Sequence, residues 1–201
     1  ALVPMLTWCA VVCGLIALTN LSSALLLFLT CMLLMYIGRV PIKYLVILTS
    51  IGLMVGSIAM YVGQRGETAL SRLKIFAQDE LPFQTEQAYI AIATGGLYGK
   101  GPGNSQQRNF LPHPYSDFIY AILVEEYGLI GGVVVVLLYL ALLYRGIRHV
   151  SQSNRAYGGL LSAGISFALA LQAMVNMGVA VGLGPVTGLP LPFVSMGGTS
   201  L

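Results

Sequence analysis

The chain has 201 residues, of which 57% are hydrophobic and only 8% are charged, and its formal net charge is +3. Soluble domains carry about 25% charged residues, so this composition excludes a protein whose whole surface faces water. The small net charge does not indicate a nucleic-acid partner, and we expect none.

Apolar runs long enough to cross a bilayer as a helix, about 18 residues or more, recur along the chain. We predict five membrane spans, over residues 1–18, 21–38, 44–62, 118–144 and 158–183. The expected fold class is therefore an all-α polytopic membrane protein, with residues 1–201 in a single membrane domain. The first run begins at Ala1 with no basic segment ahead of it, so we interpret the chain as part of a larger membrane protein rather than one led by a signal peptide.

Basic residues in the short links predict the orientation of the spans, because Lys and Arg are enriched in cytoplasmic loops. The links after the second and fourth predicted spans contain no acid, and their basic residues are Arg39, Lys43, Arg145, Arg148 and Arg155. These links lie on the same side when the spans alternate, so both are predicted to be cytoplasmic. Residues 63–117 then form a large extracytoplasmic loop, and residues 184–200 form a re-entrant outer segment.

The large outer loop is too long for a structureless connection, so we expect it to contain structure of its own. The stretch "ETALSRLKIFAQ", residues 67–78, has apolar residues at helical spacing and suits a helix lying in the membrane interface. The stretch "EQAYIAIATGG", residues 86–96, predicts a second short helix that dips partway into the membrane. The glycine-rich "GGLYGKGPGNS" that follows is too irregular for a helix, and such backbone is tolerated near a membrane only where protein covers it or water reaches it.

The glycine-rich turn around Lys100 has two interpretations. Glycines permit positive φ and let successive N–H groups converge on an anion, so the turn, with Asn104, Ser105 and Arg108 after it, could bind phosphate. Glycine-rich turns are also common connections in membrane proteins. The Lys-Ser/Thr pair of a P-loop is absent, so the sequence leaves both interpretations open.

Three acids, Asp117, Glu125 and Glu126, lie at the start of the fourth apolar run. Two prolines stop any helix ahead of them, and Ser116 is expected to N-cap a helix that begins near Asp117. Asp117 is then either a first-turn acid that interacts with the helix dipole, or a general base or cation ligand at the mouth of the span. Eight residues of helix separate Asp117 from Glu125 by about 12 Å, which is too far for the close carboxylate pair of a glycosidase. Glu125 and Glu126 either line a cavity or pair within the bundle.

Polar residues are scarce in the last third of the chain. Gln172 and Asn176 are i, i+4 amides in the fifth predicted span, and we expect them either to bind a neighbouring helix or to line a cavity. Prolines and glycines prevent residues 184–200 from forming a continuous helix. This segment, which contains Ser195, is either a connector buried in protein or a region that contacts ligand.

Five stretches together resemble one known family: "GGLYGKGPGNSQQ", "FLP", "SDFIYA", "EEYGLIGG" and "GLPLPFVSMGGTS". They resemble the SEDS family (shape, elongation, division and sporulation proteins), and "GNSQQ" with "GLPLPFVSMGG" looks closer to the FtsW cell-division branch than to the RodA elongation branch. The resemblance covers nearly the whole chain, which would correspond to about the second half of a ten-span helical bundle. It implies a peptidoglycan glycosyltransferase that polymerises lipid II at the outer face of the bacterial cytoplasmic membrane, at the division septum, with undecaprenyl diphosphate as the leaving group.

The resemblance also implies partners: a class B penicillin-binding protein, which is a transpeptidase of the FtsI type, and other division proteins of the FtsQ, FtsL and FtsB types. Two other functions compete with the enzyme. One is a carrier that moves lipid II across the bilayer, and the other is a non-enzymatic scaffold that recruits division proteins. A carrier predicts polar residues through the whole depth of the membrane, whereas here they concentrate on the predicted outer side.

The acid of the family's His-Thr-Asp-Phe stretch, regarded as catalytic, falls on Asp117, although Tyr115 and Ser116 replace the residues before it. His113 replaces a family glutamate and Asn20 replaces a family acid, so the roles of those acids are not carried over. Asp117 would accept the proton of the attacking glycan 4-hydroxyl, or hold a divalent cation, Mg2+ or Mn2+, against the diphosphate. The predicted substrate-binding residues are Lys100, Arg108, Arg72, Asn104, Ser105, Glu125, Gln172 and Ser195.

Overall fold

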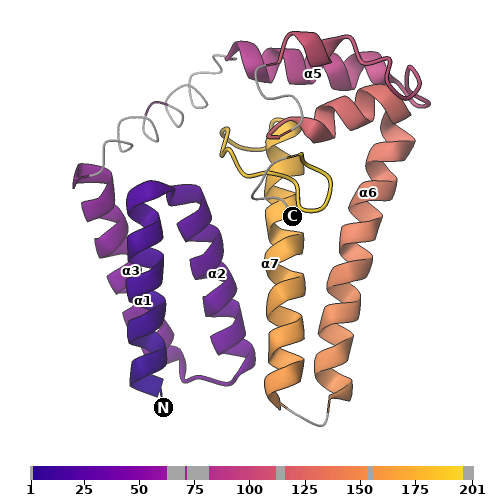
Figure 1. Ribbon diagram of the computed structural model, residues 1–201. Helices are drawn as coiled ribbons and strands as arrows, with labels where there is room; N and C mark the ends of the chain where they lie inside the picture. The colour runs from indigo at the N-terminus through magenta and orange to yellow at the C-terminus, as the bar shows by residue number, and fades with distance from the viewer. Residues whose placement is uncertain (1, 63–70, 72–81, 112–115, 154–155, 197–201) are drawn as a thin grey trace. The chain divides into compact units, whose positions relative to one another are not determined.

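The computed structural model describes residues 2–62, 71, 82–111, 116–153 and 156–196. Every regular element in this described part is a helix, which confirms the all-helical fold class predicted from the sequence (Figure 1). The helices are α1 (Leu2–Thr19), α2 (Leu21–Ile37), α3 (Ile42–Val62), α5 (Phe83–Gly95), the short 3-10 helix η1 (Gln107–Asn109), α6 (Ile119–Gln152) and α7 (Ala156–Ala180).

Two helices of the described part are long and apolar enough to cross a bilayer, over Ile119–Val150 and Tyr157–Ala180. Shorter apolar stretches lie in the first three helices, over Pro4–Thr19, Leu21–Ile37 and Ile42–Ser57. Some predicted ends differ from the observed ones. Helix α6 continues past residue 144, so Arg145 and Arg148 lie in the helix rather than in a link. The predicted interfacial helix over residues 67–78 falls outside the described residues, apart from Ser71.

The chain divides into two compact units. The first unit contains Ala1–Ser71 and Leu143–Ala168, and the second contains Arg72–Leu142 and Leu169–Leu201. In the first unit, α1, α2 and α3 pack around Met35, Leu45 and Leu48. Asn20 caps α2, since its side-chain oxygen accepts a hydrogen bond from the Ser23 amide at 3.3 Å. The residue that stands at the family acid's position therefore has a local structural role.

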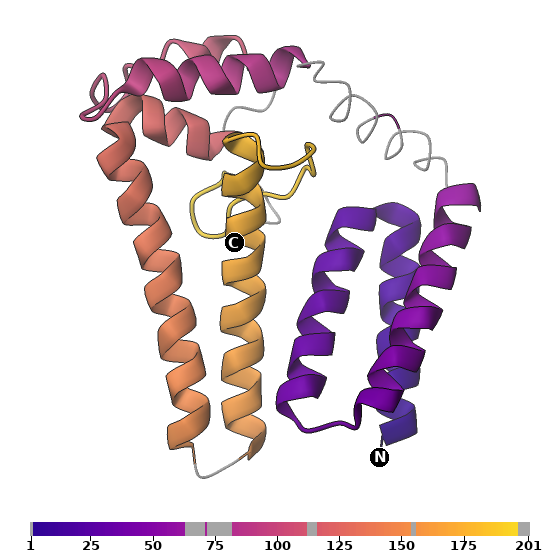
Figure 2. The ribbon, with the colours of Figure 1, turned by 180° about the vertical axis from the view of Figure 1, so that it is seen from behind.

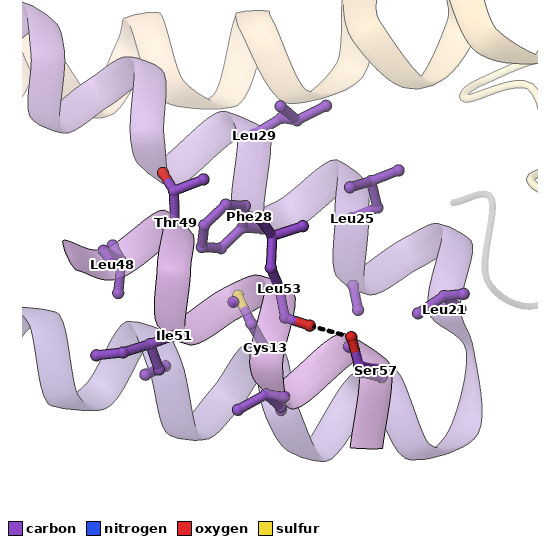
Figure 3. A pocket seen from close by; sticks show the side chains of 17 residues that line it. Cys13, Leu21, Leu25, Phe28, Leu29, Leu48, Thr49, Ile51, Leu53 and Ser57 are labelled. Carbon is purple, nitrogen blue, oxygen red and sulfur yellow. Dashed lines mark hydrogen bonds between the residues drawn. The ribbon is translucent and has the colours of Figure 1, made fainter. Parts of the chain in front are cut away.

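A cavity of about 410 Å3 lies among α1, α2 and α3 in the first unit (Figure 3). Gly52 lets α3 approach the ring of Phe28 on α2 closely, since a Cβ on Gly52 would lie 3.0 Å from that ring. The cavity's two hydroxyl-bearing residues, Thr49 and Ser57, each donate to a carbonyl of their own helix at 2.8 Å. The described residues that line this cavity include no charged one, so they offer apolar surface rather than acid–base groups.

The second unit contains the residues that the sequence singles out for chemistry. Helices α6 and α7 run side by side in opposite directions, and α5 lies across their end (Figures 1 and 2). Two buried clusters hold this unit together. One joins α6 to α7 through Tyr120, Val124, Tyr139, Ala173, Met177, Ala180 and Leu191. The other joins α5 to the start of α6 through Ala88, Ala91, Leu111, Phe118, Ala121 and Ile122.

Candidate functional site

Three glycines bring the end of α5 against a break in α6. Gly128, with φ 72° and ψ −175°, interrupts the helical backbone of α6. A Cβ on Gly95 or Gly99 would collide with the main chain of residues 124–126, and one on Gly128 would collide with Leu97. The two stretches of backbone therefore touch directly, and only glycine fits at the three contact positions.

Main-chain hydrogen bonds replace those that α6 loses at the break. In a continuous helix the Leu129 amide would donate to the carbonyl of Glu125. Instead Leu129 donates to Gly96 at 2.9 Å, and the Glu125 carbonyl accepts from the Lys100 amide at 3.0 Å. The break at Gly128 thus frees main-chain N–H and C=O groups of α6, and these groups form hydrogen bonds with the glycine-rich loop, residues 96–106.

Glu125 is the centre of a buried polar network. Its side chain is 0% exposed, and it forms a salt bridge with Lys100 at 2.7 Å. Its carboxylate also accepts hydrogen bonds from the Ser105 hydroxyl at 2.5 Å and from the amides of Gln106 at 3.2 Å and Gln107 at 3.3 Å. The N–H groups of this turn do converge on an anion, and that anion is the protein's own carboxylate. Of the two roles considered for Glu125, pairing within the bundle is the one observed.

Lys100 retains some capacity beyond this pair. Its ammonium group also donates to the Thr94 hydroxyl at 3.0 Å, and its side chain is 27% exposed. An ammonium has three N–H donors, so one donor has no acceptor among the residues that the structure describes. Asn104 turns back onto the same loop, since its side-chain amide donates to the Lys100 carbonyl at 3.1 Å. Arg108 is half-buried, and its amide donates to the Ser105 hydroxyl at 3.2 Å. Arg72 lies outside the described residues.

Asp117 lies in the turn that leads into α6, not in the helix. Because α6 begins at Ile119 and has no acid in its first turn, the predicted N-cap role of Ser116 and the first-turn role of Asp117 are wrong. Ser116 instead donates its hydroxyl hydrogen to Asp117 Oδ1 at 3.1 Å. Asp117 is half-buried. The Asp117 and Glu125 carboxylates share no hydrogen-bond partner among the described residues.

Residues 184–196, here called the outer strap, fold back beside the C-terminal part of α7 and the start of α6 (Figures 1 and 2). Asn176 of α7 binds the strap and the turn together, donating to Leu189 O at 2.7 Å and to Asp117 O at 2.9 Å. Gln172, one turn earlier, donates to Pro190 O at 2.8 Å. The two amides therefore bind irregular backbone, whereas the sequence predicted that they bind a helix or line a cavity.

Two further side chains, those of Ser195 and Tyr139, hold the strap in place. The Ser195 hydroxyl accepts from the Leu191 amide at 2.7 Å and donates to Ser116 O at 2.8 Å. The Tyr139 hydroxyl donates to Pro192 O. On the side of Asp117, a Cβ on Gly188 would lie 3.9 Å from Asp117 Oδ2. The strap therefore packs against the turn that carries Asp117 and fixes its main chain.

One buried oxygen beside Asp117 has no partner within the described residues. Both donor contacts of Asn176 use its Nδ2 atom, which leaves Oδ1 without a hydrogen bond. The residue is only 2% exposed. An unpaired buried acceptor costs about 1–3 kcal/mol, so Oδ1 is expected to acquire a donor or a cation in the working protein.

Three residues of this site, Tyr139, Thr94 and Gly128, could not be assigned to it from the sequence alone. Tyr139 resembles any other aromatic residue of an apolar helix, and Thr94 resembles an ordinary helical threonine. Gly128 was visible in "EEYGLIGG", but one glycine in an apolar run is also compatible with a straight helix. The clustering of glycines on both sides of the contact was the only available sign.

Comparison with known proteins places the chain in a family. The FtsW/RodA/SpoVE family, described as "Cell cycle protein", matches residues 1–201. The chain belongs to this family. Family membership confirms the resemblance drawn from the five motifs and, with the helical architecture, identifies the chain as a membrane protein.

Curated members of the family are similar to this chain over 59% to 95% of its length. A probable peptidoglycan glycosyltransferase FtsW from Bacillus subtilis is 36% identical over 205 residues, covering 95% of this chain and 51% of that protein. Stage V sporulation protein E from the same organism is 50% identical over 120 residues, covering 59% of this chain and 33% of that protein. The FtsW of Coxiella burnetii is 37% identical over 190 residues, covering 90% of this chain and 50% of that protein. The chain thus spans about half the length of the relatives that it matches along most of its length.

Two solved structures share the fold. One is described as "Structural coordination of polymerization and crosslinking by a peptidoglycan synthase complex"; it has a TM-score of 0.64 and 26% identity, and covers 90% of this chain and 51% of that chain. The other is a crystal structure of a rod shape determining protein RodA variant from Thermus thermophilus, with a TM-score of 0.55 and 24% identity, which covers 90% of this chain and 45% of that chain. The second supports the fold alone.

Proposed function

We propose that the chain carries the catalytic part of a peptidoglycan glycosyltransferase that polymerises lipid II, with Asp117 as the catalytic residue. Several relatives named as probable peptidoglycan glycosyltransferases support the activity. The observation that carries the assignment is how Asp117 is held. Its main chain is fixed by Asn176 and the outer strap, while its half-buried carboxylate binds only Ser116 among the described residues. A fixed backbone with an available carboxylate suits a reacting group.

The proposed reaction forms one glycosidic bond and breaks one bond to phosphate. The 4-hydroxyl oxygen of a glycan attacks the anomeric carbon of a lipid-linked sugar, and the bond to undecaprenyl diphosphate breaks. Asp117 accepts the hydroxyl proton, a role that contributes about 10²–10⁴-fold to the rate. Glu125 does not share this role, because Lys100 and Ser105 already occupy its carboxylate.

The residues around Asp117 fit a divalent cation that is also bound by the phosphates of the substrate. Among the described residues, no group of three His, Cys, Asp or Glu side chains could enclose a metal ion. Mg2+ and Mn2+, however, also bind through one or two protein oxygens together with substrate phosphates. The Asp117 carboxylate and the unpaired Asn176 Oδ1 are oxygen ligands of that kind. Such an ion would neutralise the charge on the departing diphosphate.

Basic side chains would complete the diphosphate site. Arg108 and the remaining donor of Lys100 are proposed to bind the diphosphate, with Arg72 as a third candidate. Asn104 and Ser105 hold the loop that presents these groups, so we propose that they act through it rather than by direct contact. Gln172 and Ser195 likewise hold the outer strap.

We also propose partners and a location for the whole protein. A similar solved structure is described as a peptidoglycan synthase complex that coordinates polymerization and crosslinking. This supports a class B penicillin-binding transpeptidase of the FtsI type as the partner. Likeness to FtsW proteins supports action at the division septum, beside proteins of the FtsQ, FtsL and FtsB types.

The test is glycan polymerisation from purified lipid II by the intact protein with its transpeptidase partner, followed on gels. Asp117→Asn should slow polymerisation by about 10²–10⁴-fold. Ser116→Ala is the matched control, because it removes the neighbouring hydroxyl and keeps the carboxylate, and it should stay within a few-fold of wild type. Equal rates for Asp117→Asn and wild type would contradict the catalytic role. A wild type that moves lipid II between leaflets but makes no glycan would favour a carrier.

A further inference from the structure

Phe193, in the outer strap, has a backbone conformation that is unusual for its residue type. Its φ is 64°, and Arg39 is the one other non-glycine residue of the described chain with positive φ. The left-handed region brings Cβ close to the following carbonyl oxygen, so a bulky residue enters it only where its surroundings impose it. Such strain is concentrated at functional sites.

The residues on both sides of Phe193 impose this conformation. The carbonyl of Pro192 is bound by the Tyr139 hydroxyl of α6. On the other side, Ser195 forms two bonds with Leu191: its amide donates to Leu191 O at 2.9 Å, and its hydroxyl accepts from Leu191 N at 2.7 Å. Residues 191–195 therefore form a closed turn, with the strained residue in the middle.

The turn exposes the Phe193 ring instead of burying it. Phe193 is 66% exposed, whereas Leu191 is 0% exposed and Ser195 is 6% exposed. Packing against the core thus explains the neighbours of Phe193 but not Phe193 itself. A strained backbone that holds a large apolar ring outward is expected where the ring has a binding partner.

The position of the turn indicates what that partner is. The Ser195 hydroxyl donates to the carbonyl of Ser116 at 2.8 Å, and Ser116 precedes Asp117. The strap, residues 184–196, contains no charged residue. We propose that Phe193 contacts the polyprenyl chain of the lipid-linked substrate, while Asp117 acts at the sugar end of the same substrate. This inference rests on the proposed function.

A membrane anchor would explain the exposure of an aromatic ring but not its strain. Aromatic residues in the interfacial belt bind headgroups and acyl chains without any particular backbone conformation. Leu183 provides a comparison, because it lies immediately before the strap, is 81% exposed and has no positive φ. An anchoring role would therefore be shared by Leu183, and a substrate contact would not.

The experiment compares three variants of the intact protein: Phe193→Gly, Phe193→Leu and Leu183→Ala. Glycine accepts the observed φ without strain and removes the ring. Leucine keeps an apolar side chain of similar size. The readouts are the KM for lipid II, the inhibition constant of undecaprenyl diphosphate, which has the chain but no sugar, and the melting temperature in detergent.

For Phe193→Gly we expect both constants to rise about tenfold, as partial burial of one phenyl ring predicts, with a melting temperature equal to or above that of wild type. Phe193→Leu and Leu183→Ala should stay within about threefold of wild type. The proposal is overturned if the melting temperature falls together with activity, since Phe193 is then structural. It is also overturned if KM rises alone, which indicates a sugar contact, if Leu183→Ala has the same effect, or if Phe193→Gly changes nothing. A wild type that makes no glycan would instead refute the proposed function.

Discussion

Replacing Glu125 by Gln tests whether the buried network holds the glycine-rich loop to α6. The change keeps the shape of the side chain and removes its charge. At present one carboxylate oxygen accepts from Lys100 and Gln106, and the other accepts from Ser105 and Gln107. A glutamine side chain has one carbonyl oxygen, and its NH2 group takes the place of the second carboxylate oxygen. An NH2 group donates hydrogen bonds and does not accept them, so the two donors that now bind the second oxygen would lose their acceptor.

The expected cost follows from these contacts. One buried backbone N–H left without an acceptor costs about 1–3 kcal/mol, and removing one partner of a buried ion pair costs about 3–5 kcal/mol. Water reaches Lys100, whose side chain is 27% exposed, so the lower part of these ranges applies. We expect Glu125→Gln to lower the free energy of unfolding by about 2–3 kcal/mol, which corresponds to a fall in melting temperature of about 4–12 °C.

Thermal unfolding in detergent and hydrogen exchange provide the assay. The amides of Gln106 and Gln107 should exchange faster in Glu125→Gln, because they lose their acceptor. Glu126→Gln is the matched control, since Glu126 is the adjacent acid and its carboxylate accepts no hydrogen bond within the described residues. Glu125→Gln combined with Lys100→Met should cost less than the sum of the single changes, with a coupling of about 1–3 kcal/mol. Identical melting temperatures for Glu125→Gln, Glu126→Gln and wild type would refute this account of the loop.

Three other substitutions test the remaining contacts. Gly128→Ala places a Cβ into the facing main chain at φ 72°, so the melting temperature should fall by several degrees; an unchanged value would show that α6 can straighten there. Asn176→Asp sets a carboxylate against the carbonyl of Asp117, so the kcat of polymerisation should fall at least about tenfold, and a normal kcat would show that this contact does not position Asp117. Tyr139→Phe removes the hydroxyl bond to Pro192 and should cost about 1 kcal/mol in unfolding experiments; a loss as large as that of Tyr139→Ala would mean that the hydroxyl bond accounts for the whole contribution of this side chain.

The sequence predicts the helices well because their apolar runs depend only on residue type. The irregular outer strap was also predictable, since Pro185, Pro190 and Pro192 interrupt any helix there. The ends of the helices were harder to place. Nothing local marks Ile119 rather than Asp117 as the first helical residue of α6, because both follow the same two prolines.

The site was only partly predictable, because its contacts join residues that are distant in sequence. Lys100 and Glu125 were each singled out, but their pairing crosses 25 residues. Asn176 and Asp117 are 59 residues apart, and their contact depends on how α7 and α6 pack. The separation of Asp117 from Glu125 stays a prediction, because it assumed one continuous helix from Asp117, whereas α6 begins at Ile119.

The contact of Gly95, Gly99 and Gly128 has a consequence for building chimeras between relatives of this protein. Each glycine leaves room for backbone that the opposite segment supplies, so neither segment can be exchanged without regard to the other. A crossover point between residues 99 and 128 is safe only where both parents have glycine at these positions. Segments 83–111 and 116–130 should therefore be exchanged as one block, together with whatever sequence joins them.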